Sequence, residues 1–229
     1  MNVVITQSNY IPWKGGFDAM ALADVVVLYD EMQYTKRDWR NRNIIKTPQG
    51  LRWLTIPVEV KGKYLQKINE TRISDKRWNQ NHLNLLKQNY RNANCYNEVI
   101  SWVEELYKKC EFEFLSDINQ YFIENINQFL GIKTEIIRTE KFVLADEKTE
   151  RLVDICKKLN ATDYFSGPAA KKYMDESKFS DANIKVNYFD YSGYKEYEQL
   201  HGEFDHRVSI LDLIFNVGDK SSEYLKYIK

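Results

Sequence analysis

The sequence predicts an α/β fold, a Rossmann-like three-layer sheet domain with a mainly helical insert. Short, continuous apolar runs recur along the chain, as expected for strands that are buried on both faces of a parallel sheet. Longer segments between them carry apolar residues at intervals of three and four, the spacing of an amphipathic helix. Only 9 glycines and 4 prolines occur in 229 residues, a composition that disfavours a many-turned β-sandwich.

The first part of the chain has strand, loop, helix, strand order. Strands are expected at residues 3–5 and 25–29, with a helix at residues 16–23 between them. Parallel strands joined in this way need a right-handed crossover. A basic segment follows, and then a hairpin is predicted in which apolar runs flank a turn at residues 47–50.

Helical periodicity then dominates about residues 75–130. It predicts one helix that starts near residue 75, a second at residues 98–107 and a third at residues 115–130, with Gly131 as its C-cap. We therefore expect a single α/β domain over residues 1–229 that carries a helical insert or subdomain at about residues 75–130.

The α/β order returns after the helical part. Strands are expected at residues 134–138, 162–165 and 184–189, and helices at residues 147–159, after residues 166–170 and at residues 209–215. Ser209 precedes the last of these helices, and Asp212 stands where a capping box carries its acidic residue.

Composition and charge exclude several classes of protein. The 33 Lys and Arg residues balance 33 Asp and Glu residues, so total charge argues against a strongly basic nucleic-acid binder. The 3 cysteines are widely spaced, without a CxxC pair, and predict neither a disulfide framework nor a zinc site. No apolar run approaches the ~20 residues of a membrane-spanning helix. Because no export signal is recognisable either, we expect a cytoplasmic protein.

The segment after the predicted first strand is the first candidate for ligand binding. Open α/β sheets bind ligands at the carboxyl ends of their strands. A glycine pair lets backbone approach a ligand, and a helix N-terminus attracts anions. A plain tight turn is the alternative interpretation, because neither GxGxxG nor a P-loop signature is present. The predicted binding residues here are Gln7, Asn9, Tyr10, Trp13, Lys14 and Gly15.

A basic segment after the second strand is the next candidate. Four cations, Lys36, Arg37, Arg40 and Arg42, lie within seven residues and alternate in part with asparagines. Guanidinium groups pair bidentately with phosphate, so we expect one small phosphorylated ligand; Gln33 is assigned to the same site. The alternative interpretation is a solvated basic turn that binds no ligand. Nucleic acid fits less well, because plentiful acidic residues elsewhere leave only a pocket-sized cationic spot.

Two later segments are the remaining candidates for the functional site. Ser166 and Gly167 stand between a predicted strand and a helix, where they would accept a phosphate or sugar oxygen or serve only as a plain N-cap. His201 is a candidate general base, whereas His82 lies on an apolar stripe and is expected to be packed. No Ser-His-Asp triad is predicted, since a nucleophile elbow is missing. The scattered histidines and cysteines predict no metal site.

Four motifs together resemble the WbqC-like family over nearly the whole chain. They are Gln7 with Tyr10-x-Pro12-Trp13-x-Gly15-x-Phe17, then Asp30-x-x-Gln33-x-x-Lys36-Arg37-x-Trp39-x-Asn41-Arg42-Asn43, then Trp53-Leu54-Thr55-x-Pro57, and Phe204-x-x-x-x-Ser209-Ile210-x-Asp212. Departures from the family pattern are Ser8, Gly16 and His206. We expect Gly16 to open the first loop, and His206 inherits no role.

This resemblance implies a place in bacterial O-antigen, lipopolysaccharide or related surface polysaccharide biosynthesis. The implied task is modification of a nucleotide-linked amino sugar by transfer of an acyl or aminoacyl group, such as glycyl, to the sugar amine. The residues that the resemblance assigns to the site are Gln7, Tyr10, Lys36, Arg37, Asn41, Arg42, Asn43, Ser209 and Asp212.

The leading hypothesis is therefore a transferase in which Arg37, Arg40 and Arg42 hold a diphosphate. Amide formation needs a base and oxyanion donors; Asp30 or His201 is the predicted base, and the predicted donors are Asn41, Asn43 or Tyr10. The acyl donor would be an acyl-CoA, an activated amino acid or one formed with ATP. The alternatives are an ATP-dependent acyl-activating or nucleotidyltransferase-like enzyme and a non-catalytic module that binds a sugar nucleotide.

Overall fold

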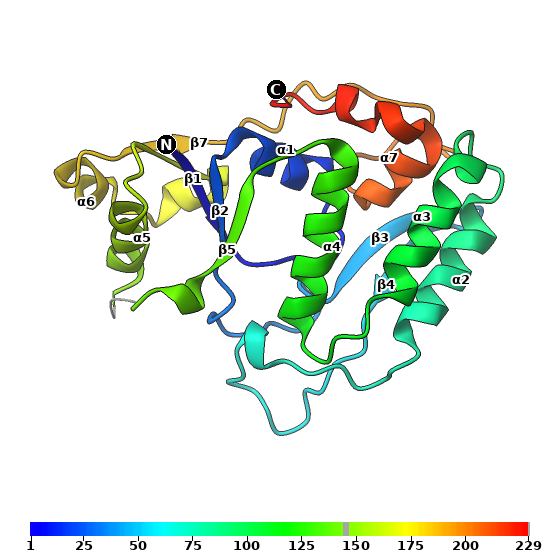
Figure 1. Ribbon diagram of the computed structural model, residues 1–229, viewed down its shortest axis with the longest axis horizontal. Coiled ribbons are helices and arrows are strands. Elements are labelled where there is room, and N and C mark those ends of the chain that lie inside the picture. Colours follow the sequence, from blue (N-terminus) through cyan, green and yellow to red (C-terminus); the bar gives the residue numbers. More distant parts are fainter. Residues whose placement is uncertain (144–146, 229) are drawn as a thin grey trace.

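The computed structural model describes residues 1–143 and 147–228. In this part of the chain, five parallel strands form one sheet in the order β5-β2-β1-β6-β7, and two antiparallel strands form a separate hairpin (Figure 1). The sheet strands are β1 (Asn2–Thr6), β2 (Val25–Leu28), β5 (Glu135–Arg138), β6 (Asp163–Ser166) and β7 (Lys185–Tyr188). The hairpin strands are β3 (Arg42–Thr47) and β4 (Gly50–Thr55). The predicted α/β class is confirmed.

Most of the helices lie where the apolar periodicity predicts them. They are α1 (Lys14–Leu22), α2 (Trp78–Tyr90), α3 (Tyr96–Lys108), α4 (Leu115–Leu130), α5 (Lys148–Lys158), α6 (Glu176–Asp181) and α7 (Ile210–Val217). Short 3₁₀ helices span Ile68–Glu70, Thr139–Lys141, Pro168–Lys172 and Gly218–Tyr224. Gly131 caps α4 in the left-handed conformation, as predicted. Over the described residues, no helix combines the length and the apolar character needed to cross a membrane.

Alternate residues of the central strands belong to two separate apolar cores. Val4 and Val26 pack on the same side as Phe17 of α1, in the larger core. Val3 and Val27 point to the opposite face, where α5 and α6 cover them. Figure 1 shows α5 and α6 on one side of the sheet and α1 and α4 on the other. The sheet is thus the middle of three layers, as in a Rossmann-like fold.

The strand order places a topological switch point between β1 and β6. β1 continues through α1 to β2, which pairs with one edge of β1, with Val3 opposite Val25. β6 pairs with the other edge, with Val3 opposite Tyr164. The connections therefore leave the carboxyl ends of β1 and β6 in opposite directions, and this opens a crevice between the two ends.

Helices α2 to α4 pack against the hairpin and against α7. Leu83 of α2 and Leu54 of β4 lie in the same apolar core as the α1 face of the sheet. Tyr90 stacks on Phe215 of α7, with ring centroids 4.8 Å apart. The apolar core of these helices is therefore continuous with that of the sheet.

The structure differs from the sequence expectation after β6. Ser166 remains in β6, where it lies opposite Tyr188, so Gly167 and not Ser166 stands at the start of the short helix that follows. That helix is a 3₁₀ helix, and α6 begins only after Asp175, whose carboxylate accepts a hydrogen bond from the Ser177 amide. A second N-cap, which the sequence analysis overlooked, therefore divides the expected helix into two short ones.

A buried carboxylate joins α1 to the C-terminal end of the chain. Asp18 is fully buried, and it accepts a hydrogen bond of 2.6 Å from the Tyr194 hydroxyl. It also accepts bonds of 2.7 Å and 2.8 Å from the backbone amides of Lys226 and Tyr227. Because the two amides and the hydroxyl all donate to one side chain, the packing of the C-terminal segment on α1 depends on Asp18.

Asp18→Asn is expected to lower the free energy of unfolding by about 2–4 kcal/mol, since a neutral amide replaces a buried charged acceptor. Urea denaturation followed by circular dichroism measures the loss. Asp181→Asn, at the exposed C-terminal residue of α6, is the control and should change the stability by less than ~0.5 kcal/mol. Equal effects in the two variants would contradict the role given to Asp18.

Candidate functional site

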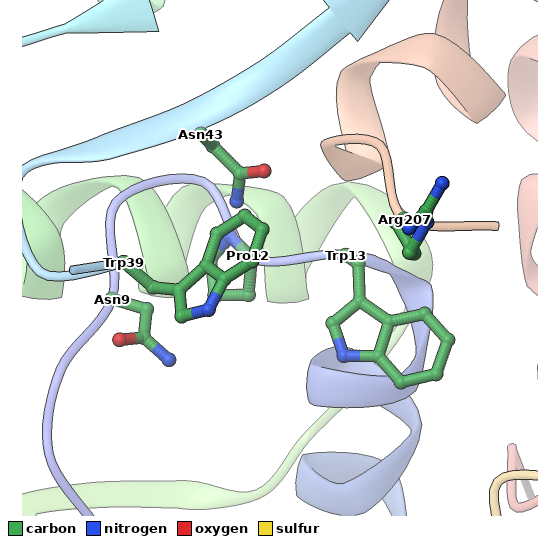
Figure 2. Close-up of a pocket in the computed structure, with 6 residues that line it drawn as sticks. All are labelled: Asn9, Pro12, Trp13, Trp39, Asn43 and Arg207. Atoms are coloured by element: carbon green, nitrogen blue, oxygen red, sulfur yellow. The ribbon is translucent and has the colours of Figure 1, made fainter. Parts of the chain in front are cut away.

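Two adjoining cavities lie around the loop between β1 and α1. The first, which we call the tryptophan cavity, has a volume of about 250 Å³ and is lined by Asn9, Pro12, Trp13, Trp39, Asn43 and Arg207 (Figure 2). The second, the switch-point cavity, has a volume of about 200 Å³ and lies where β1 and β6 end. Its polar lining residues include Thr6, Gln7, Asn9, Ser166, Gly167 and Tyr191. Asn9, Pro12 and Trp13 line both cavities, so the two share a wall.

Asn43 holds the loop that forms this shared wall. Its Nδ2 donates to the backbone carbonyls of Tyr10, at 3.1 Å, and Ile11, at 2.8 Å. Its Oδ1 accepts a bond of 2.8 Å from the Ile44 amide. Although Asn43 reaches the tryptophan cavity, its amide is used within the protein, and the predicted role as an oxyanion donor gives way to a positioning role.

The indole of Trp13 explains why position 15, the first of the two adjacent glycines, has no room for a side chain. Trp13 is the N-cap of α1, and a Cβ atom at Gly15 would lie only 2.3 Å from its ring. Gly16 lines the switch-point cavity, and a Cβ atom there would lie 2.9 Å from Cβ of Pro12. The N-terminus of α1, with its partial positive charge, is therefore beside both cavities.

Lys14 has a different environment from the one that the sequence predicts. Its Nζ donates to the Lys195 carbonyl at 2.6 Å. The ammonium lies 5.3 Å from the ring centroids of Tyr194 and Tyr197 and 5.7 Å from that of Phe204. Burial lowers the pKa of Lys14 to about 8. Lys14 thus holds the C-terminal coil, residues 189–208, against α1 and is not among the lining residues of either cavity.

Arg40 contacts the cavity lining indirectly, by a hydrogen bond to Asn9. Its largely buried guanidinium donates to Oδ1 of Asn9 and lies 3.8 Å from the Asp38 carboxylate. Burial lowers the pKa of Arg40 from its usual value, although Asp38 and Asp30 oppose this shift. Because Oδ1 of Asn9 is occupied, its NH₂ group remains to donate to a ligand in either cavity.

The other cations of the basic segment do not converge on one point. Arg42 lies over the Trp53 ring at 3.9 Å and donates to the Arg37 carbonyl. Lys36 and Arg37 are exposed and are not among the lining residues. The four cations therefore do not form one cluster. Arg40 contacts Asn9 of the cavity lining, and Arg207, which lies outside this segment, lines the tryptophan cavity.

Arg207 is a lining residue that the sequence analysis missed. Its guanidinium lies at the tryptophan cavity and pairs with Asp205 at 2.9 Å, while 78% of its side chain remains exposed. Only an Asp-x-Arg turn marks it in the sequence, and such turns are common on protein surfaces. Its proximity to Trp13 depends on the path of the C-terminal coil.

The predicted bases lie outside both cavities. Asp30 is buried, and its carboxylate accepts a bond of 2.8 Å from the Ser8 amide. Burial raises the pKa of Asp30, against the effect of that bond. His201 is on the C-terminal coil, with its Nε2 2.8 Å from the Asn89 carbonyl. Neither is among the lining residues.

Two further predicted residues form hydrogen bonds with the backbone. Asn41 is buried and donates to the Ile56 carbonyl at 2.8 Å, beside the base of the hairpin. Gln33 is exposed and donates to the Tyr64 carbonyl at 2.8 Å. Neither residue lines the two cavities.

Ser209 and Asp212 support the C-terminal part of the structure. Ser209 caps α7 as predicted, and its hydroxyl accepts a bond from the Leu211 amide at 3.2 Å. The Asp212 carboxylate does not complete a capping box. It is buried and accepts bonds of 2.7 Å from the hydroxyls of Tyr90 and Tyr197, and burial raises its pKa. Asp212 therefore joins α7 to α2 and to the C-terminal coil.

Tyr10 belongs to a buried network and not to a cavity wall. Its hydroxyl is 2.6 Å from the Tyr107 hydroxyl and 2.9 Å from Nδ1 of His82. Nε2 of His82 is 3.1 Å from the Thr55 carbonyl. Because a carbonyl only accepts, Nε2 carries the proton and Nδ1 accepts from Tyr10. Burial lowers the pKa of His82 to about 4, as fits the packed role predicted for it.

The side chains that line the two cavities offer amides, hydroxyls, aromatic rings and one guanidinium. Within the described residues, neither lining contains an Asp, Glu or His side chain. Nor does any group of three or more His, Cys, Asp or Glu residues in residues 1–143 and 147–228 lie suitably for a metal ion. The arrangement is suited to a ligand that carries oxygens and a flat or apolar part.

This chain is similar to known proteins over nearly its whole length. The profile of the WbqC-like protein family matches residues 7–224. The chain is 48% identical over 227 residues to an uncharacterized protein of Mycobacterium tuberculosis, Rv1507c, in an alignment that covers 99% of this chain and 98% of that protein. No solved structure matches the chain.

The network around Tyr10 predicts acid sensitivity. Between pH 6.5 and pH 4 the unfolded chain protonates His82 whereas the folded protein does not, so the free energy of unfolding falls as the pH falls through this range. Wild type should lose about 3 kcal/mol more than His82→Gln between pH 7 and pH 4. Urea titrations at the two pH values measure the difference. His201→Gln should retain the loss, and a loss equal in all three proteins would refute the role of His82.

Proposed function

Because this chain belongs to the WbqC-like protein family, we propose that it is a transferase that binds a nucleotide-linked amino sugar. In this proposal the enzyme transfers an acyl or aminoacyl group to the sugar amine, in bacterial surface polysaccharide biosynthesis. The observation that carries the proposal is the pair of adjoining cavities at the switch point between β1 and β6. Ligands of open α/β sheets, nucleotides among them, bind at this position.

The size of the cavities supports an extended ligand. Each one is smaller than the ~300–1,000 Å³ of a typical ligand pocket, but the two together reach this range. A ligand that spans both must pass the shared wall, where the NH₂ group of Asn9 and the N-terminus of α1 are able to bind an anion. A sugar joined through a diphosphate to a nucleoside has this extended shape, with its negative charge in the middle.

The proposed reaction needs few protein groups. The amine nitrogen of the sugar attacks the carbonyl carbon of a thioester or an acyl adenylate, so that a C–N bond forms and the C–S or C–O bond breaks. The thiolate or AMP leaves, and the proton that the amine loses passes to the departing thiolate or to solvent water. Hydrogen-bond donors at the developing oxyanion lower the barrier, and in this proposal the side-chain amide of Gln7, which lines the switch-point cavity, supplies one of them.

A non-catalytic module that binds a sugar nucleotide is the second candidate function. It is favoured by one observation, the lack of Asp, Glu and His side chains among the described residues that line the cavities. An acyltransferase normally has such a side chain as a general base. In this alternative the protein presents the nucleotide sugar to another enzyme.

Arg207→Ala is expected to weaken binding of a nucleoside diphosphate sugar about 10-fold, because it removes a charged donor to the diphosphate. Isothermal titration calorimetry measures the affinity. Arg77→Ala is the matched control: Arg77 also pairs with an aspartate two residues earlier and is 85% exposed in its side chain, but it lies at the start of α2. Equal effects of the two substitutions would rule out the assignment of Arg207.

Turnover separates the two candidate functions. Purified protein incubated with nucleotide-linked amino sugars and with an acyl-CoA, or with an amino acid and ATP, should give a product heavier by one acyl or aminoacyl group. Mass spectrometry detects the shift. Binding of the sugar nucleotide without product from any donor would support the non-catalytic module. Pyrophosphate release in the absence of the amino sugar would instead indicate an acyl-activating enzyme.

A further inference from the structure

We propose an orientation for the ligand: its nucleobase stacks on Trp39 at the tryptophan cavity, and its sugar occupies the switch-point cavity. This inference rests on the proposed function and goes beyond it by assigning each end of the ligand to one cavity. It also gives Trp39 and Trp53, two residues of the family motifs, a role in ligand binding.

Trp39 forms an aromatic wall of the tryptophan cavity, and neighbouring side chains support its ring. Its ring centroid lies 5.1 Å from that of Trp53, and the Arg42 guanidinium covers Trp53 at 3.9 Å. Despite these contacts Trp39 remains 40% exposed, and it lines the cavity (Figure 2). A large aromatic ring that is braced by its neighbours and still exposed loses little entropy when a planar group stacks on it.

The side chains of the tryptophan cavity suit a base better than a sugar. Pro12 and Trp13 line it together with Trp39, so that the cavity presents flat and apolar walls. The amide of Asn43 is used by the backbone carbonyls of Tyr10 and Ile11. Stacking, which every nucleobase accepts, is therefore the main interaction available here, and a sugar would find few partners for its hydroxyls.

The switch-point cavity has the opposite chemistry. Thr6, Gln7 and Ser166 stand at the carboxyl ends of β1 and β6, and Tyr191 adds a phenol from the C-terminal coil. Hydroxyl and amide groups both donate and accept hydrogen bonds, as recognition of sugar hydroxyls requires. This cavity is therefore assigned to the sugar, and the amine to be acylated would lie within it.

The shared wall then receives the diphosphate. Asn9, whose Oδ1 is occupied by Arg40, presents its NH₂ group there, and Trp13 begins α1 beside it. Arg207, which is also paired with Asp205, contributes its guanidinium from the side of the tryptophan cavity. The groups that are able to bind a diphosphate therefore lie at the shared wall and in the tryptophan cavity, and the switch-point cavity is left for the sugar.

Gly167 offers a way to test the sugar end alone. It lines the switch-point cavity, and a Cβ atom at this position would meet no atom within 4 Å. Its backbone, at φ −66° and ψ 150°, lies in a region that any residue before a proline adopts. Gly167→Val therefore adds volume to the cavity without straining the chain.

The experiment compares a nucleoside diphosphate with its sugar conjugate in five proteins. UDP, dTDP and GDP, each with an amino-sugar conjugate, are titrated by calorimetry into wild type, Trp39→Ala, Trp39→Phe, Gly167→Val and Tyr64→Ala. Trp39→Ala should weaken the diphosphate and the conjugate alike, about 10-fold, the loss expected from one base stack. Gly167→Val should weaken the conjugate about 10-fold and leave the diphosphate within about twofold, since only the sugar meets the added methyl groups.

Two controls secure the assignment to Trp39. Tyr64→Ala removes an aromatic ring that is 82% exposed and belongs to neither lining, and it should change no affinity. Trp39→Phe keeps a ring and should retain most of the binding, but the tryptophan fluorescence quenching caused by the stacked base should be largely lost. Unchanged thermal unfolding of each variant shows that the fold persists.

The outcomes distinguish this inference from the proposed function. If Gly167→Val weakens the bare diphosphate and Trp39→Ala affects only the conjugate, the ligand binds in the reverse orientation. If neither substitution changes any affinity while wild type binds, the ligand lies outside these cavities. Both results overturn the orientation and leave nucleotide-sugar binding intact. If wild type binds none of the nucleotides or conjugates, the proposed function itself fails, and the orientation fails with it.

Discussion

The loop that joins β1 to α1 is buried although it has no regular secondary structure, so its backbone polar groups need partners from elsewhere in the chain. The Tyr10 amide donates to the Trp39 carbonyl at 3.1 Å, and the Pro12 carbonyl accepts from the Ile210 amide at 2.9 Å. The side chain of Asn43 satisfies the carbonyls of Tyr10 and Ile11. The basic segment, the hairpin and α7 therefore all assemble on this loop, and both cavities depend on its position.

The same requirement applies to the buried charged residues behind the site. Asp18 and Asp212 are buried carboxylates that accept from tyrosines of the C-terminal coil. Lys14 and Lys46 are buried ammonium groups that donate to carbonyls of the same coil, those of Lys195 and Glu203. Each of these hydrogen bonds offsets the free-energy cost of burying the two polar groups that it joins. Together they hold a segment without helix or strand against the core, and this segment carries Tyr191 and Arg207 to the two cavities.

Much of the fold was predictable because it depends on local periodicity. The fully apolar run of β2, the stripe of α4 with Gly131 after it, and the Ser209 cap of α7 all follow from the types of neighbouring residues. The general position of the cavities was predictable too, since parallel strands bring their carboxyl ends to one edge. The second cap at Asp175 escaped prediction because a polar residue between two short helical patterns has no periodicity of its own.

The sequence by itself determined the α/β class, the order of the elements and the loop where the cavities form, because these depend on side chains that are close together along the chain. Only the tertiary structure decided which charged residues reach those cavities. Lys14 lies one residue after Trp13 and yet points into the C-terminal coil, whereas Arg207, almost two hundred residues further on, lies beside Trp13. The reason is that a buried polar group without a partner is costly, and its partner belongs to whichever segment packs against it.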